Sequence, residues 1–243
     1  MTVIAVIPAR YASVRFPGKP LAPLAGRAMI LHVVDAARAA RSLSGVIVAT
    51  DDPRIAACVR DAGAEAVMTS PAAASGTDRV AEVARMRTAD AWVNLQGDEP
   101  LMAPENVDLA VETLLAGPDR EIATLTVPLP PAHAGDPNVV KAAVARDGRA
   151  LYFSRAAIPH PRQGAPAYRK HLGIYAFRAR TLERLAALPP SPLEQAESLE
   201  QLRWLEGGYA IWAGEGVSDS IGVDTPDDLA EAERRLKKEE VAP

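Results

Sequence analysis

The sequence predicts an α/β protein with a central, mixed but mostly parallel sheet and helices on both of its faces. In the first half, continuous apolar runs alternate with helix-like segments, a pattern typical of parallel strands buried on both sides. The second half is richer in strand-like segments, which indicates a mixed extension of that sheet. With 243 residues, of which 48% are hydrophobic, the chain can build a sizeable core.

The expected elements can be placed one by one. In the first half, strands are expected at 3–7, 45–50, 65–68 and 91–96, and helices at 28–40, from Pro53 onward and at about 77–86. In the second half, strands are expected at 121–129, 139–145, 150–155, 171–178 and 209–213. Two helices are expected after the strand at 171–178, the second of them over 192–207, and a terminal helix is expected from Pro226 onward. Asp52 and Ser191 stand where an N-cap is required, and Gly207 where a helix ends.

Composition excludes several classes of protein. The net charge is −4, whereas a nucleic-acid-binding protein usually carries a basic excess. Cys58 is the single cysteine, so neither an intramolecular disulfide nor a cysteine-based metal site is possible. No apolar run approaches the roughly 20 residues needed to cross a bilayer, and no leader pattern is present. We therefore expect a cytoplasmic protein without membrane insertion.

A basic loop follows the first predicted strand. It holds Arg10, Arg15 and Lys19 in front of a predicted helix, and open α/β sheets bind ligands at the carboxyl ends of their strands. Arginine and lysine are the usual ligands of phosphate oxygens. The Walker pattern is not met, because Ser13 replaces its first glycine and Pro20 follows the lysine. From the residues alone, both an anion site and a solvated basic turn remain open.

Two carboxylates lie at predicted element ends. Asp98 comes directly after the strand that carries Asn94 and Gln96 on one face, and aspartate is a usual Mg²⁺ ligand. Asp224 stands just before the terminal helix. Thr225 accounts for the N-cap of that helix, and the two acidic residues after Pro226 interact favourably with the positive end of the helix dipole. Neither of these structural roles accounts for an aspartate at position 224.

Eight sequence blocks then occur in order across nearly the whole chain: PARYASVRFPGKPL, VATDD, SGTDR, NLQGDEP, LYFSRAAIP, HLGIYAF, LEQLR and GVDTPDDL. Together they resemble the 3-deoxy-manno-octulosonate cytidylyltransferase family, the CMP-Kdo synthetases. The resemblance implies a nucleotide-diphospho-sugar transferase fold, which is Rossmann-like, and CMP transfer from CTP to Kdo, an acidic eight-carbon sugar of bacterial lipopolysaccharide. It also implies Mg²⁺ as the cofactor and a homodimer.

The resemblance further implies which residues form the site. Those expected to contact CTP are Ala9, Arg10, Arg15, Lys19, Thr50, Asp51, Ser75, Gly76 and Arg79. Those expected to contact the sugar are Gln96, Arg162, His171, Tyr175, Glu200 and Gln201. The implied catalytic residues are Arg10, Lys19, Asp98 and Asp224, and the last two are the implied Mg²⁺ ligands.

Two of these assignments have a competing explanation. His171 and Tyr175 share one face of a predicted strand, but such a pair is also common in protein cores. The stretch 160–170 is shorter than the family pattern, which weakens the assignment of Arg162. We expect a single domain over 1–243, with a nucleotide-binding part at about 1–115 and a sugar-binding and dimerisation part at about 120–215.

In the implied reaction, the anomeric 2-hydroxyl of Kdo attacks the α-phosphorus of CTP in line and pyrophosphate leaves. Two Mg²⁺ ions are a hypothesis, and no side chain is assigned as a general base. One alternative is a nucleotidylyltransferase with another acceptor, such as sialic acid, an amino-substituted Kdo or a sugar 1-phosphate. The other is a non-catalytic nucleotide-binding protein on the same fold.

Overall fold

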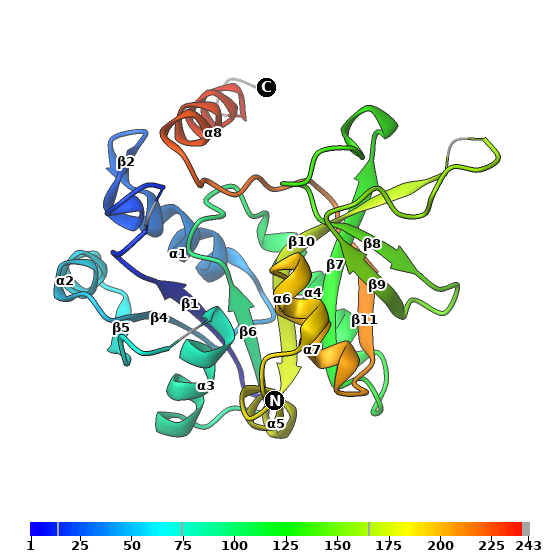
Figure 1. Ribbon diagram of the computed structural model, residues 1–243. Coiled ribbons are helices and arrows are strands. Elements are labelled where there is room, and N and C mark those ends of the chain that lie inside the picture. Colours follow the sequence, from blue (N-terminus) through cyan, green and yellow to red (C-terminus); the bar gives the residue numbers. More distant parts are fainter. Residues whose placement is uncertain (14, 74, 165, 240–243) are drawn as a thin grey trace. The chain divides into compact units, whose positions relative to one another are not determined.

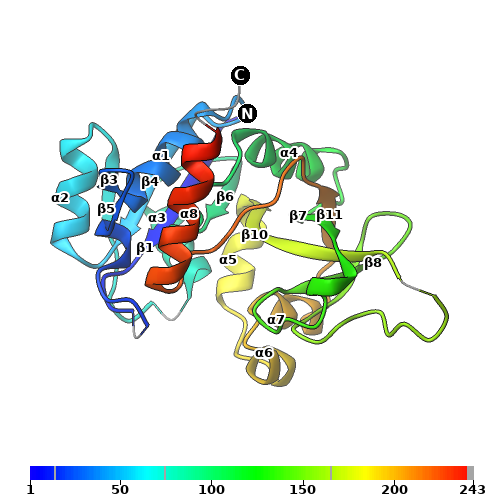
Figure 2. The ribbon, with the colours of Figure 1, turned by 90° about the horizontal axis from the view of Figure 1, so that it is seen from above.

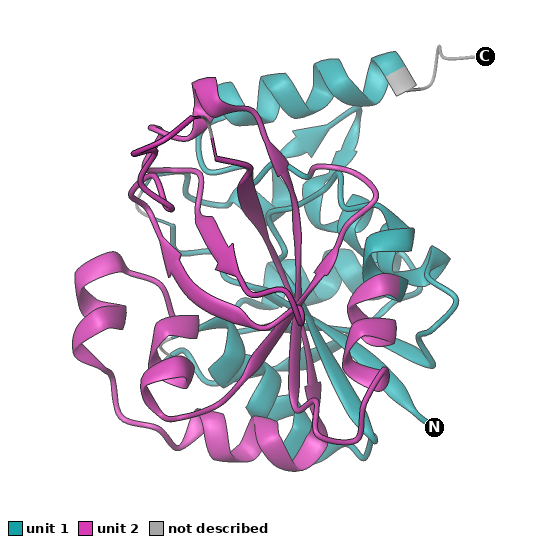
Figure 3. Cartoon of the chain, turned by 90° about the vertical axis from the view of Figure 1, so that its right-hand side faces the viewer, with its two compact units in different colours: residues 1–108, 220–243 teal, residues 109–219 magenta. Residues whose placement is uncertain are grey.

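The computed structural model describes residues 1–13, 15–73, 75–164 and 166–239. The chain divides into two compact units (Figure 3). The first unit contains Met1–Asp108 and the chain from Ser220 onward, and the second contains Leu109–Asp219. The C-terminal segment thus belongs to the same unit as the N-terminal half.

Four parallel strands form the sheet of the first unit (Figure 1). They are β1 (Val3–Ala9), β4 (Gly45–Thr50), β5 (Glu65–Met68) and β6 (Ala91–Leu95), in the order β6-β1-β4-β5. The helices between them are α1 (Met29–Ala39), α2 (Pro53–Asp61) and α3 (Gly76–Met86). Crossovers between parallel strands are almost always right-handed. In the order β6-β1-β4-β5, this rule predicts α1 and α2 on one face of the sheet and α3, whose connection runs back across the sheet, on the other.

Several short elements follow β1 and complete the first unit. They are a 3-10 turn, η1 (Lys19–Leu21), and a small hairpin of β2 (Pro23–Leu24) and β3 (Arg27–Ala28). The terminal helix α8 (Pro226–Glu239) lies beside this hairpin (Figure 2). Leu24, Met29, Val223 and Ala232 form the buried cluster that joins these parts, and Phe16 packs against it.

The second unit is built around β7 (Ile122–Leu129). β10 (Tyr168–Arg178) pairs with it antiparallel, and β11 (Ile211–Glu215) pairs with it parallel. β8 (Lys141–Val144) and β9 (Ala150–Ser154) form an antiparallel hairpin beside β10. The remaining elements are η2 (Pro131–His133), α5 (Ala179–Ala186), α6 (Pro192–Glu197) and α7 (Gln201–Glu206).

The predicted fold class is confirmed: parallel strands alternate with helices in the first unit, and the strand pairing of the second unit is mixed. The predicted caps are also confirmed. Asp52 accepts from the backbone of Arg54, and Ser191 forms a capping box with Glu194. Among the described helices, none is long and apolar enough to cross a membrane.

Two α-helical regions differ from the sequence prediction. α4 (Pro104–Leu115) was not predicted, and it spans the boundary between the two units in the sequence. The helix predicted over 192–207 is broken into α6 and α7, because Ser198 has a φ of +52°. Arg155 binds the carbonyl oxygens of Glu197 and Ser198, so these oxygens do not continue the helical hydrogen-bond pattern.

Candidate active site

The basic loop lies between β1 and η1, as the sequence predicts. Its cations have different environments: Arg10 and Arg15 are exposed, whereas Lys19 is 9% exposed. Within the described residues, Arg10 makes no ion pair. It is therefore the cation of this loop that is most open to an incoming anion.

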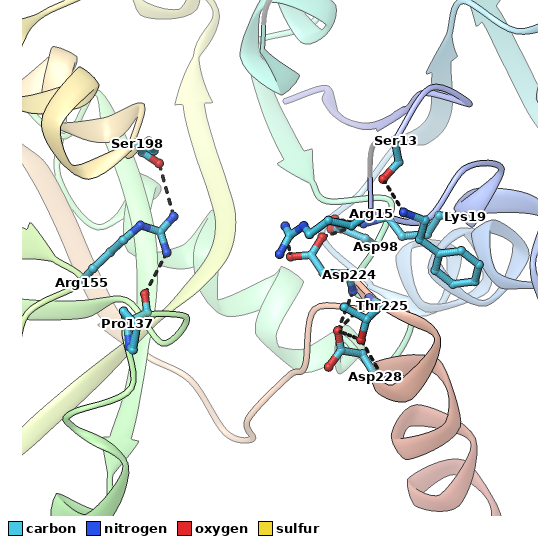
Figure 4. A network of polar contacts seen from close by, with 11 residues as sticks. Ser13, Arg15, Lys19, Asp98, Pro137, Arg155, Ser198, Asp224, Thr225 and Asp228 are labelled. Atoms are coloured by element: carbon cyan, nitrogen blue, oxygen red, sulfur yellow. Dashed lines mark hydrogen bonds and ion pairs between the residues drawn. The ribbon is translucent and has the colours of Figure 1, made fainter.

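Lys19 lies between the two predicted carboxylates (Figure 4). Its Nζ donates to Asp98 Oδ2 at 2.7 Å and to Asp224 Oδ1 at 3.0 Å. Arg15 Nη2 donates to Asp224 Oδ2 at 2.8 Å. Cations and carboxylates from distant parts of the chain thus converge at one point and neutralise each other's charge.

Close backbone contacts bring these segments together. The N–H of Val223 donates to the Asp98 carbonyl at 2.8 Å, which places Asp224 beside the turn that follows β6. Gly97 lies against the end of β1, and a Cβ at this position would be 2.6 Å from the Pro8 carbonyl oxygen. Position 97 therefore has no room for a side chain, and Asp98 is held at the carboxyl ends of β1 and β6.

The charge of Asp224 is strongly favoured by its neighbours. Burial alone would raise the pKa of this carboxyl, but the hydrogen bonds and positive charges of Lys19 and Arg15 outweigh burial and lower the pKa below its usual value. Asp224 consequently remains ionised near neutral pH and available to a cation.

A different wall of the site begins at the N-terminus of α3. Arg79 is 4% exposed, and its guanidinium donates to Asp51 Oδ2 and to Thr69 Oγ1, each at 2.8 Å. Thr50 is fully buried, and its hydroxyl accepts from the backbone of Asp52. Asp51 therefore orients Arg79, and Thr50 belongs to the core. A contact of either residue with CTP remains a prediction.

These walls enclose a cavity of about 310 Å³. Ten of the predicted site residues line it: Ala9, Arg10, Arg15, Lys19, Ser75, Gly76, Arg79, Gln96, Asp98 and Asp224. Asn94 lies behind Gln96 and accepts a hydrogen bond from its amide at 3.3 Å, so both side chains lie on the predicted common face of β6. The cavity combines a basic side, two carboxylates and a polar amide.

Two predicted sugar ligands lie in the core of the second unit. His171 is 9% exposed, its Nε2 is 2.9 Å from Thr124 Oγ1, and its ring contacts those of Phe153 and Tyr175. Burial, with a smaller contribution from the charge of Lys170, lowers the pKa of His171 to about 3. A neutral imidazole in an aromatic cluster is a packing and hydrogen-bonding group, so the structural explanation of this pair gains support.

The other predicted sugar ligands of the second unit have varied environments. Glu200 is the N-cap residue of α7 and is half-buried, and Gln201, the next residue, is buried. Arg162 is exposed in the segment between β9 and β10. A sugar-binding role for these residues remains a prediction.

The sequence is closely similar to those of several known proteins. It is 52% identical over 238 residues to the 3-deoxy-manno-octulosonate cytidylyltransferase of Anaeromyxobacter sp. (strain Fw109-5), a match that covers 96% of each chain. It is 49% identical to the protein of the same name from Chlorobaculum tepidum, over 98% of each chain. A family model described as Cytidylyltransferase matches residues 4–215. The chain belongs to the 3-deoxy-manno-octulosonate cytidylyltransferase family.

Solved structures agree with this family membership. A CMP:2-keto-3-deoxy-manno-octonic acid synthetase complexed with CTP matches with a TM-score of 0.95 and 43% identity, over 98% of this chain and 100% of that chain. A nucleotidyl transferase from Methanothermobacter thermautotroptrophicus matches with a TM-score of 0.66 at 16% identity, over 98% of this chain and 99% of that chain, and shares the fold alone. The resemblance that the eight sequence blocks indicate is thus confirmed.

The donor set of the cytidylyltransferase cavity suits Mg²⁺. Asp98 and Asp224 offer carboxylate oxygens, and their side chains are 34% and 45% exposed. Within the described residues, no group of three or more histidine, cysteine, aspartate or glutamate side chains could enclose a metal. Mg²⁺ is commonly held by one or two carboxylates together with substrate phosphates and water, so a pair of carboxylates beside a phosphate-binding loop fits this ion.

The cavity also has lining residues that the sequence analysis does not assign. These are Pro8, Ser13, Pro20, Ala73 and Gly97. Pro8, Ser13 and Pro20 lie within or beside the basic loop, and Gly97 precedes Asp98, so their proximity in the sequence was an available signal. Ala73 had no such signal, because it is an apolar residue in a loop before α3.

Proposed function

We propose that this protein transfers CMP from CTP to the anomeric 2-hydroxyl of Kdo, giving CMP-Kdo and pyrophosphate for lipopolysaccharide synthesis. The observation that carries the proposal is the convergence of Arg10, Arg15 and Lys19 with Asp98 and Asp224 on one cavity. The sequence similarity to the named cytidylyltransferases over nearly the whole chain supports the choice of nucleotide and sugar.

Each loop cation has a distinct task in the proposed reaction. The exposed guanidinium of Arg10 binds the α-phosphate, where negative charge increases as the new P–O bond forms. Arg15 and Lys19 bind the β- and γ-phosphates and stabilise pyrophosphate as it leaves. The bond from the sugar oxygen to the α-phosphorus forms while the bond to the leaving pyrophosphate breaks, and the hydroxyl proton passes to solvent.

Asp98 and Asp224 are the proposed ligands of Mg²⁺. When bound there, Mg²⁺ supplies charge neutralisation of the phosphates and acidifies a coordinated hydroxyl. Both aspartates already face cationic nitrogen atoms, which shows that each carboxylate is oriented toward positive charge. Isothermal titration of Mg²⁺ in the presence of CTP tests this part, and unchanged binding after Asp98→Asn would contradict it.

The sugar contacts are proposed to come from Gln96 in the first unit and from Arg162, His171, Tyr175, Glu200 and Gln201 in the second. Because the pKa of His171 is lowered to about 3, this residue acts as a neutral hydrogen-bonding group and not as a cation.

We further propose a homodimer, on the basis of the family resemblance, and a cytoplasmic location, where CTP is available. Light scattering tests the dimer: the measured molar mass should be about twice the 25.7 kDa of one chain.

The acceptor is tested by measuring pyrophosphate release from CTP with each of several sugars. Kdo, 8-amino-Kdo, sialic acid, a sugar 1-phosphate and a reaction without acceptor form the panel. We expect release with Kdo to exceed release with sialic acid or the 1-phosphate by at least about 100-fold, because a site built to pair with particular substrate groups rejects analogues that leave its groups unpaired. Equal or faster release with another acceptor would reassign the substrate.

A further inference from the structure

The basic loop is closed on itself by Tyr11. The backbone N–H of Gly18 donates to the Tyr11 carbonyl at 2.9 Å, and this hydrogen bond joins the two ends of the segment that carries Arg15. Gly18 has a φ of +73°, and a Cβ at this position would lie 3.0 Å from both Cζ and Oη of Tyr11. The Tyr11 ring therefore packs directly on the Gly18 backbone, and the next residue is Lys19.

The same ring is held from helix α2. The guanidinium carbon of Arg54 lies 3.4 Å from the centroid of the Tyr11 ring, which is a close cation–π contact. Asp52 binds this guanidinium at two points, through Oδ1 to Nε at 2.9 Å and through Oδ2 to Nη2 at 2.6 Å. A two-point pair fixes the plane of a guanidinium, so Arg54 is oriented for its contact with the ring.

Asp52 is adjacent to a second supporting residue. Asp51 holds Arg79, which lines the cavity, by an ion pair of 2.8 Å. The junction between β4 and α2 therefore supports two walls of the cavity: Asp51 supports the wall at α3, and Asp52 supports the basic loop through Arg54. Tyr11 is the residue through which the second support reaches the loop.

We infer that Tyr11, Gly18, Arg54 and Asp52 form a clasp that positions Arg15 and Lys19 to bind the triphosphate. This Tyr11 clasp rests on the proposed function, because it presumes that the loop binds CTP. Tyr11 is a positioning residue: it is not among the described residues that line the cavity, and it acts through the direction in which Lys19 leaves Gly18. Loss of the clasp should weaken CTP binding and leave the acceptor unaffected.

The first experiment compares Tyr11→Leu with Tyr11→Phe. The dissociation constant of CTP with Mg²⁺ is measured by calorimetry, and KM is measured separately for CTP and for Kdo. We expect Tyr11→Leu to weaken CTP binding about tenfold, because both the cation–π contact and the packing on Gly18 are lost. Tyr11→Phe keeps the ring, so it should stay within about twofold of the wild type. The KM for Kdo should be unchanged in both variants.

The second experiment uses a matched pair of glycines. Gly18→Ala and Gly26→Ala carry the same backbone penalty, because φ is +73° at Gly18 and +79° at Gly26. A Cβ at Gly26 would meet nothing within 4 Å, whereas a Cβ at Gly18 would meet the Tyr11 ring. We expect weaker CTP binding for Gly18→Ala alone. Its effect should become smaller in the Tyr11→Leu background, where the ring is absent.

The outcomes separate the clasp from the proposed function. An unchanged CTP dissociation constant in folded Tyr11→Leu would overturn the clasp, as would equal effects of Gly18→Ala and Gly26→Ala. If Tyr11→Leu does not fold, the CTP dissociation constant of Arg54→Leu is measured in its place. Arg54 is exposed, so its substitution should leave the core intact, and loss of its contact with the Tyr11 ring should still weaken CTP binding. Wild-type protein that binds CTP but releases no pyrophosphate with Kdo would contradict the acceptor, while the CTP dissociation constants would still decide the clasp.

Discussion

At the scale of single residues, Lys19 controls the charge balance of the cavity. Its ammonium group is nearly buried and contacts both Asp98 and Asp224. Without it, two carboxylates would face each other with only the exposed Arg15 to offset them. The same ammonium group is a proposed ligand of the leaving phosphates, so one residue serves both the fold of the site and its chemistry.

We predict that Lys19→Met lowers kcat/KM for CTP by at least about 100-fold, as expected for the loss of a charged group that stabilises developing negative charge. Lys237→Met is the matched control, because Lys237 makes an exposed ion pair on α8. Steady-state kinetics of both variants at saturating Kdo provide the measurement. Wild-type kinetics for Lys19→Met would exclude this lysine from the reaction.

The buried His171 predicts a pH dependence of stability. Its pKa is about 3 in the folded protein and near 6.5 in the unfolded chain, so between these values the unfolded state binds more protons. The free energy of unfolding should therefore fall as the pH drops below 6.5, by about 1 kcal/mol at pH 5.5 from this residue alone.

Urea unfolding of the wild type and of His171→Gln at pH 7.5 and 5.5 measures this contribution. Between these two pH values, the free energy of unfolding of the wild type should fall by about 1 kcal/mol more than that of His171→Gln. His133→Gln is the control, because it removes an exposed histidine without opening the interior. An equal pH response of the wild type and His171→Gln would show that His171 does not titrate differently in the two states.

How far the site could be predicted depends on the kind of residue. Arg10 and Asp98 could be assigned because they follow strands whose ends the sheet brings together, and Asp224, which precedes the terminal helix, because a family block assigns its role. Asp51 was assigned as a CTP contact, but the sequence does not reveal that Arg79 is buried against it. The contact of Tyr11 with Gly18 and Arg54 joins three separate positions of the chain and has no sequence signature.

At the scale of elements, β8 and β9 are tied to the neighbouring loops by two basic side chains. Lys141 is fully buried, and its Nζ donates to the carbonyl oxygens of Asp136, Val139 and Arg155. The Arg155 side chain in turn donates to the carbonyl oxygens of Pro137 and Ser198 (Figure 4). It also donates to the carbonyl oxygen of Glu197. Loops without regular hydrogen-bond partners are thereby held against the hairpin.

We predict that Lys141→Met lowers the free energy of unfolding by about 3 kcal/mol, because three carbonyl oxygens lose the buried ammonium group that donates to them. Lys170→Met, which removes a lysine whose partner Asp219 is partly exposed, should cost less than about 1 kcal/mol. Denaturant unfolding of the two variants measures the difference. Equal costs would show that the carbonyl oxygens find other donors.

The elements themselves were largely predictable from apolar patterns and caps. β4 and β5 have the predicted bounds, and Pro53 begins α2 as expected. The break at Ser198 could not be foreseen, because it depends on Arg155, which lies more than 40 positions away in the sequence. α4 did have a signal, namely Val107, Ala110, Val111 and Leu114 at helical spacing after Pro104.

At the scale of the whole molecule, the proposed substrate contacts are divided between the two units. The cavity residues proposed for CTP belong to the first unit, and most of the residues proposed for the sugar belong to the second. This division predicts that substitutions in each unit should affect one substrate at a time. The sequence alone did not show that the C-terminal segment with Asp224 belongs to the first unit.

We predict that Arg162→Ala raises the KM for Kdo about fivefold to tenfold and leaves the KM for CTP unchanged, because a charge-assisted hydrogen bond to the sugar carboxylate is lost. Arg146→Ala removes another exposed arginine of the second unit and should change neither value. A raised KM for CTP in Arg162→Ala would argue against a role limited to the acceptor.

The central claim is tested most directly by identifying the products formed from CTP and Kdo. The protein is incubated with both substrates and Mg²⁺, and the products are followed by ³¹P NMR and mass spectrometry, with Asp98→Asn in parallel. The account predicts equal amounts of pyrophosphate and CMP-Kdo from the wild type and almost none from Asp98→Asn. Pyrophosphate without CMP-Kdo, or wild-type turnover by Asp98→Asn at saturating Mg²⁺, would contradict it.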